Sequence, residues 1–145
     1  MLIGLKKTNL NIYNDDLGSV LHGIKKDEPT FKSFGEVYFS KVKYKAIKAW
    51  KKHNKMTLNL VVPVGEVLFY FKDLRKESKT YNRICKITLC QSPYFRLTVP
   101  PGLWFGFRGV SKGTNIVCNV ADLIHDKNEV SKIDLNQIKV DWRIK

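Results

Sequence analysis

The densest group of chemically capable side chains is a run of positive charge between positions 41 and 55. It contains seven lysines and no acidic residue: Lys41, Lys43, Lys45, Lys48, Lys51, Lys52 and Lys55. Such a strip could hold a phosphate group or a polyanion, because the whole chain carries a formal net charge of +13 and attracts anions. Arginine, which reads guanine and phosphate in bidentate fashion, is scarce in this chain. A small phosphate-bearing partner is therefore favoured over nucleic acid.

One imidazole, that of His53, lies inside this lysine run. Imidazole suits proton transfer near neutral pH, whereas an ordinary lysine stays protonated and cannot accept a proton. A lysine becomes a base only where burial or neighbouring cations lower its pKa. Lys51 and His53 are two residues apart, so on an extended segment both side chains point to one face.

Asp73 and Arg75 form a second charged pair, again two residues apart. On an extended segment they also share a face. The pair predicts either a local ion pair that ties down the loop at 76–82 or a contact between Arg75 and a phosphate. The sequence leaves both interpretations open.

Metal chemistry has little support in the sequence. The three cysteines, Cys85, Cys90 and Cys118, are odd in number and lie among apolar residues, which favours free thiols. His22 and His125 lie in contexts typical of surface loops. Because zinc and iron sites need three or four protein ligands held close together, we expect no metal and no other cofactor.

Strand signals dominate the chain, in short runs rich in β-branched and aromatic residues. They predict strands over Glu36–Val42, Leu58–Val62, Glu66–Phe71, Ile84–Leu89, Tyr94–Val99 and Asn115–Val120. Clusters of Gly, Pro, Ser and Asn separate these runs, and no long window has the periodicity of an amphipathic helix. The sequence therefore predicts one all-β domain over residues 1–145, with residues 1–35 as an N-terminal extension that supplies edge strands.

Two further expectations concern where the protein works. No apolar run approaches the roughly 20 residues of a membrane span. The first ten residues lack the apolar core and cleavage site of a signal peptide. We therefore expect a cytoplasmic protein with no membrane partner.

An ordered set of motifs runs along the chain from position 48 onward. It consists of K-A-W-K-K-H at 48–53, G-E-V at 65–67, D-L-R-x-x-S-x-T at 73–80, P-P-G-x-x-x-G-F at 100–107, N-E at 128–129 and a terminal segment at 134–142. This set, within Glu36 to Trp142, resembles the dTDP-4-dehydrorhamnose 3,5-epimerase family. The resemblance implies a cupin-type jelly-roll β-barrel, a homodimer and a nucleotide-diphosphate sugar as ligand.

The resemblance also implies catalytic roles. In that family a histidine paired with an aspartate removes the proton next to a keto group, and a tyrosine returns a proton from the opposite face. Lys51 stands at the histidine position and Asp134 at the aspartate position, while Cys118 and Asn119 lie near the tyrosine position. A close Asp134 would form a buried ion pair with Lys51 and raise its pKa. We therefore expect weak or absent epimerisation. In an active protein the resemblance implies Lys51 or His53 as the candidate base, with Asp134 orienting it.

A second departure from the family is Phe105, which stands where the family motif carries a histidine. For binding, we expect the barrel interior to offer aromatic faces and cations to a sugar nucleotide. The expected residues are Tyr38, Trp50, Phe69, Phe71, Trp104 and Phe107, together with Lys48, Arg75 and Lys51. The same aromatic side chains would equally fill a closed core. The segment Val67–Phe71 is apolar on both faces, which fits a dimer interface or a cavity for a planar ligand.

These observations leave three functions open. The first is an epimerase or isomerase of deoxysugar or surface-polysaccharide biosynthesis that acts on a nucleotide-diphosphate sugar. The second is a catalytically inactive family member that serves as a binding or structural module. A nucleic-acid-binding barrel that uses the strip at 41–55 is the least favoured.

Overall fold

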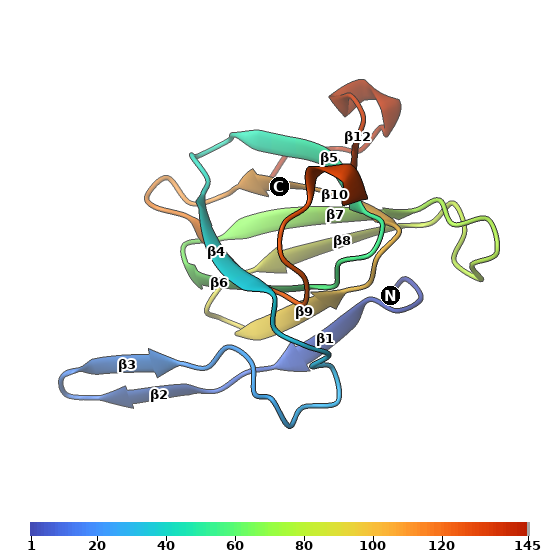
Figure 1. Ribbon diagram of the computed structural model, residues 1–145. Coiled ribbons are helices and arrows are strands. Elements are labelled where there is room, and N and C mark those ends of the chain that lie inside the picture. Colours follow the sequence, from blue (N-terminus) through green and yellow to red (C-terminus); the bar gives the residue numbers. More distant parts are fainter. Residues whose placement is uncertain (145) are drawn as a thin grey trace.

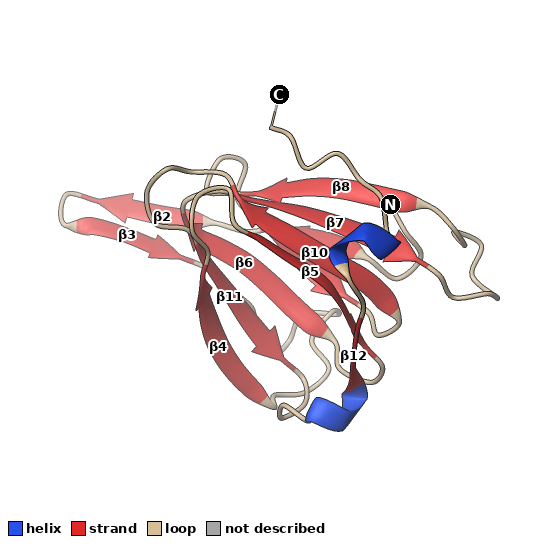
Figure 2. Ribbon diagram, turned by 90° about the horizontal axis from the view of Figure 1, so that it is seen from above, coloured by secondary structure: helices blue, strands red, loops and turns tan. Residues whose placement is uncertain are grey.

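The computed structural model describes residues 1–144, which form two five-stranded antiparallel sheets and a separate hairpin. The first sheet has the order β1 (Lys6–Asn9), β9 (Phe95–Val99), β6 (Leu58–Val64), β11 (Ile116–Ala121) and β4 (Glu36–Lys41). The second has the order β12 (Val130–Lys132), β5 (Ile47–His53), β10 (Leu103–Gly109), β7 (Val67–Asp73) and β8 (Ile84–Leu89). Figures 1 and 2 show the two sheets facing each other. The all-β class expected from the sequence is confirmed.

The main core lies between the two sheets. Alternate residues of β6, such as Leu58 and Leu60, meet alternate residues of β7, such as Phe69 and Phe71. This alternation follows from the period of two along a strand, which sends every second side chain into the space between the sheets. All four of these side chains are buried. The core fixes the positions of the central strands and leaves functional side chains to the sheet margins.

A second core covers the outer face of the second sheet. Leu68 and Tyr70 of β7 point away from the main core and pack with Trp50 and Trp104. Part of the chain's own C-terminal segment closes this layer, since Ile138, Val140 and Trp142 pack on it. The double-sided apolar character of 67–71 is thus satisfied within one chain, by a core on each face.

The C-terminal segment is joined to this layer by polar contacts as well. The indole N–H of Trp50 donates to the carbonyl of Leu135, at 3.1 Å, in the short 3₁₀ helix η2 (Leu135–Gln137). The hydroxyl of Tyr70 donates to the carbonyl of Asp141, at 2.7 Å. A Cβ added at Gly106 would lie 3.1 Å from the Trp142 ring and 2.4 Å from Ala49 Cβ, so this close approach needs glycine.

The N-terminal residues form an edge strand and an arm. Strand β1 pairs with β9 at one edge of the first sheet. The hairpin of β2 (Ile12–Asp15) and β3 (Gly18–Leu21) projects away from the two sheets (Figure 1). The fully buried guanidinium of Arg96 then anchors the returning chain, because it donates to the carbonyl of Gly23 and pairs with Glu28. None of the described helices has the length and hydropathy of a membrane span.

Candidate active site

Three adjoining hollows lie beside strand β5. The largest has a volume of about 510 Å³, and a second of about 320 Å³ and a third of about 50 Å³ share lining residues with it. Lys51 lines all three, and Tyr38 and His53 line the two smaller ones. The candidate bases therefore face a common space between β5 and β4.

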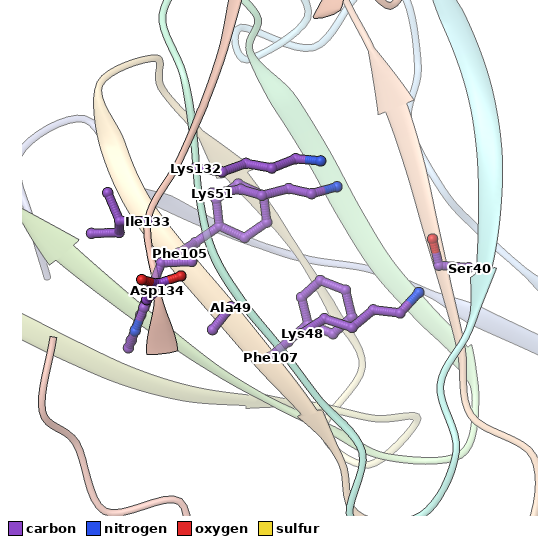
Figure 3. A pocket seen from close by; sticks show the side chains of 10 residues that line it. Ser40, Lys48, Ala49, Lys51, Phe105, Phe107, Lys132, Ile133 and Asp134 are labelled. Carbon is purple, nitrogen blue, oxygen red and sulfur yellow. The ribbon is translucent and has the colours of Figure 1, made fainter. Parts of the chain in front are cut away.

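The pairing of β5 with β10 decides which way the lysines point. Lys51 lies opposite Phe105 and Lys48 lies opposite Phe107. A step of three positions along β5 is therefore matched by a step of two along β10. Simple alternation would send Lys48 and Lys51 to opposite faces, but this irregularity brings them to the same one. Figure 3 shows both lysines, with Lys132 of β12, extending into the hollow beside Phe105 and Phe107.

His53 forms a buried pair with Glu129. The acid lies at the end of the 3₁₀ helix η1 (Lys127–Glu129), directly before β12, and β12 pairs with β5 so that Val130 lies opposite His53. Glu129 Oε1 contacts His53 Nδ1, and both residues are only 6% exposed. Glu129 Oε2 accepts backbone N–H groups of Asn54 at 3.0 Å and Lys55 at 2.9 Å. The Glu129 side chain is therefore held by His53 of β5 and by the backbone that follows β5, while β12 fixes the position of its own backbone.

These contacts determine the protonation of the pair. The hydrogen bonds from His53 and from the backbone lower the pKa of the Glu129 carboxyl, although burial acts in the opposite direction. An ionised carboxylate can only accept, so His53 Nδ1 carries the proton that joins the two residues. In the neutral ring, Nε2 then holds the free lone pair. His53 is thus a histidine oriented by a carboxylate, with one nitrogen available as a base.

Tyr38 reaches the same space from the other sheet. It lies on β4 directly opposite Asn119 of β11, and the Asn119 amide donates to its hydroxyl oxygen at 2.8 Å. Burial raises the pKa of the Tyr38 phenol, while this hydrogen bond works against the rise. Because the phenolic oxygen accepts from Asn119, its own hydrogen remains available for another acceptor. Tyr38 is therefore built as a hydrogen-bond donor toward the hollow.

Lys51 differs from the sequence expectation. Within residues 1–144 no ion pair joins Lys51 to Asp134. Asp134 is exposed and follows β12. In Figure 3 its carboxylate lies on the opposite side from the ammonium groups of Lys48, Lys51 and Lys132. Partial burial, followed by the charges of Lys132 and Lys48, lowers the pKa of the Lys51 ammonium. The expected rise in this pKa was wrong, since it depended on a close acid.

The other predicted binding residues divide between several places. Lys48 and Trp50 both border the largest of the three hollows, and Trp50 is also part of the outer core. Trp104 lies in the same outer core, under the ammonium of Lys52. Arg75 forms an ion pair with Asp73, which is one of the two interpretations that the sequence left open. Phe105 and Phe107 form the aromatic wall of the largest of the three hollows, and Phe69 and Tyr38 join them around the smallest one.

Sequence reasoning missed Glu129. It belongs to the Asn128–Glu129 motif of the resemblance, but only its position before β12 reveals that it meets His53. No local pattern gives this contact, because it depends on the pairing of β12 with β5. The described residues contain no group of three or more His, Cys, Asp or Glu side chains placed to hold a metal.

Three comparisons show which known proteins this chain is similar to. The family model for dTDP-4-dehydrorhamnose 3,5-epimerase matches residues 47–145. The spore coat polysaccharide biosynthesis protein SpsL of Bacillus subtilis (strain 168) is 29% identical over 108 residues, which cover 74% of this chain and 72% of SpsL.

Solved structures extend the likeness over the whole fold. The crystal structure of a dTDP sugar isomerase from Desulfovibrio desulfuricans G20 is 34% identical, with a TM-score of 0.93, over 97% of this chain and 92% of that one. A dTDP-4-dehydrorhamnose 3,5-epimerase from Bacillus anthracis str. Ames, with TDP and PPi bound, is 20% identical, with a TM-score of 0.85, over 100% and 91% of the two chains. The cupin-type jelly-roll fold expected from the sequence is confirmed. This chain belongs to the dTDP-4-dehydrorhamnose 3,5-epimerase family.

Proposed function

We propose that this protein is an epimerase or isomerase that moves protons at carbon atoms next to the keto group of a thymidine-diphosphate sugar. The observation that carries the proposal is the buried His53–Glu129 pair at the edge of the hollow. A lysine at the family's histidine position suggested a lost base, but His53 supplies an imidazole that is already held by a carboxylate. Family membership supports the class of substrate and reaction.

His53 and Tyr38 supply the two halves of the proton transfer. His53 Nε2 takes the proton from the carbon beside the keto group, and the resulting charge on the keto oxygen is stabilised by the nearby ammonium groups. Tyr38 comes from the facing sheet, so it can return a proton to the other face of the sugar ring. Asn119 supports this step because its N–H donor stabilises the phenolate left behind.

The lysines at the rim account for binding of the diphosphate. Lys48 and Lys132 extend from β5 and β12 into the largest of the three hollows beside β5. Their charges attract phosphate, and Phe105 and Phe107 offer apolar faces beside them. Arg75 lines a different surface hollow with Ile3, Glu77, Ser78 and Lys79, so its predicted substrate contact is not part of this proposal.

The test has two arms. Thymidine diphosphate should raise the melting temperature by mass action, equivalent to about 2.7 kcal/mol at a concentration 100 times the Kd. Incubation of TDP-4-keto-6-deoxyglucose with the protein in deuterated water should place deuterium beside the keto group, as measured by mass spectrometry. Glu129→Gln should slow this exchange and leave nucleotide binding intact, because Glu129 acts only through His53.

The outcomes separate the alternatives. Nucleotide binding without any deuterium uptake would indicate the inactive binding module. If neither arm responds and the protein is instead retained on heparin in a salt-dependent manner, the nucleic-acid alternative gains support.

We further propose that two copies associate through the edge strand β4. This strand has a partner on one side only, and its outward residues Val37 and Phe39 are 46% and 67% exposed. An exposed apolar edge favours pairing with a second strand. Light scattering should report a dimer for the native chain, and Phe39→Lys should shift it to the monomer. A monomeric native chain would contradict the proposal.

A further inference from the structure

Lys51 is an unusual lysine for its surroundings. It lines all three hollows, and Lys48 and Lys132 lie close enough to act on its charge. Asp134 also lines the largest of these hollows, but it is exposed, and within residues 1–144 no ion pair joins it to Lys51 (Figure 3). The ammonium groups of Lys48 and Lys132 repel a positive charge on Lys51. Together with partial burial, they shift the Lys51 amine toward its neutral form relative to an exposed lysine.

A neutral lysine amine is a nucleophile. Desolvation and adjacent cations are the two features that activate such amines toward carbonyl groups, and both act on Lys51. Phe105, which lies opposite Lys51 on β10, adds an apolar wall. His53 follows two residues later on the same strand and lines two of the same hollows. An amine and an oriented imidazole therefore face one ligand-sized space.

We propose that Lys51 forms an imine with the keto carbon of the sugar, so that the protein works through a covalent adduct. This inference rests on the proposed function, because it requires a keto sugar in the hollow. The adduct gives the lysine at the family's histidine position a chemical role of its own. It also gives Lys51 and His53 different roles in one reaction: Lys51 forms the adduct, and His53 removes the proton.

The step balances without any redox partner. The Lys51 nitrogen bonds to the carbonyl carbon. The carbonyl oxygen receives one proton from this nitrogen and one from solvent and leaves as water, which gives a protonated imine. His53 then removes the proton from the neighbouring carbon, and that electron pair forms a C=C bond as the nitrogen becomes neutral. Tyr38 returns a proton to this carbon and restores the protonated imine. Water finally releases the ketone and the free amine.

The test is reductive trapping of the adduct. The full chain is mixed with TDP-4-keto-6-deoxyglucose and sodium borohydride, and the modified lysine is located by peptide mass spectrometry. We expect the label on Lys51, at least about tenfold above its level on other lysines, because a positioned amine reacts at a high effective concentration. Thymidine diphosphate, which has no keto group, should leave no label.

Two variants make the result specific. Lys51→Arg keeps a cation but removes the nucleophile, so the label should disappear. Lys52→Arg is the matched control, because Lys52 lies on the outer face over Trp104 and should leave the label unchanged. Lys132→Met removes a neighbouring charge, so trapping at Lys51 should need a higher pH.

Deuterium exchange and the thermal shift with thymidine diphosphate are measured on the same samples. Exchange and nucleotide binding without a trapped adduct would overturn the imine and leave the proposed function standing. The same holds if Lys51→Arg exchanges at the native rate. Absence of exchange, binding and adduct together would overturn both proposals. A label spread evenly over surface lysines would also refute a role for Lys51.

Discussion

Two buried carboxylates, those of Asp73 and Glu129, show how similar groups come to serve different ends. Asp73 is fully buried, and its oxygens accept hydrogen bonds from Arg75, Ser78 and Thr80, all within seven residues along the chain. Glu129 also has its oxygens fully engaged, but one partner is His53, 76 positions away. Asp73 holds a loop together, whereas Glu129 orients a ring that borders an open hollow.

The difference lies in what the partners face. The partners of Asp73 surround it in one loop, and none of them lines the space beside Lys51. The backbone groups that hold Glu129 are equally structural, yet the imidazole on its other oxygen has a second nitrogen free for chemistry. A buried, low-pKa carboxylate is therefore not functional by itself. Its function depends on whether one of its hydrogen-bond partners has a second group that can take part in chemistry.

The largest effect should come from His53. Replacing His53 with Gln removes the base while it keeps a hydrogen-bonding side chain next to Glu129. Deuterium exchange beside the keto group should fall by about 10²- to 10⁴-fold, the range of general-base catalysis. Circular dichroism should remain that of the native fold. If His53→Gln exchanged at the native rate, the pair of His53 and Glu129 would have no role in the chemistry.

Asp73→Ala should destabilise the fold and leave the chemistry alone. Removal of one partner from a buried ion pair costs about 3 kcal/mol or more, since the remaining groups lose their acceptor. Urea unfolding measures this loss, and exchange per folded molecule should stay native. Asp16→Asn, at an exposed site, should change stability by less than about 0.5 kcal/mol. Equal losses in the two variants would contradict the structural role of Asp73.

Lowering the pH should reduce the stabilisation that each of the two carboxylates gives to the fold. The pKa of each is lowered in the folded protein, so each stabilises the fold above its unfolded pKa of about 4 and loses this contribution as pH falls through its folded value. Stability measured in urea should therefore decline progressively below about pH 5. Asp73→Asn should flatten this decline. A native curve that is flat between pH 5 and pH 2 would argue against both assignments.

The smallest effect should come from a single partner of Asp73. The Ser78 hydroxyl donates to Asp73 Oδ2 at 2.6 Å, and two other residues also donate to this carboxylate. Ser78→Ala should therefore cost only about 1 kcal/mol of unfolding free energy. Deuterium exchange should be unchanged. A large loss of exchange would mean that the Asp73 loop reaches the site after all.

Local patterns predicted the fold well. The six runs of β-branched and aromatic residues all become strands, because alternating burial and turn residues are encoded within a few positions. Strand β5 was harder to predict, since its residues 47–53 are mostly lysines and small or aromatic side chains without clean alternation. Its irregular pairing with β10 breaks the period of two on which such predictions rest.

The candidate site was predicted only in part for the same reason. Lys51 and His53 were found because they are close in sequence and of suitable type. The acid that meets His53 depends on the pairing of β12 with β5, which no local pattern reveals. Asp134 fitted the expected motif but lies four residues past His53's partner Val130, beyond the end of β12. The ion pair of Asp73 and Arg75, in contrast, was anticipated because it is local.

The C-terminal segment connects the two sides of β5. Residues 133–142 cover Trp50 on the outer face, and Glu129, four residues before this stretch, meets His53 on the inner side. Detachment of this segment would weaken the hold of β12 and withdraw the acid from the imidazole in one event. Protease nicking near the C-terminus and inactivation should therefore run in parallel, and an occupied site should slow both.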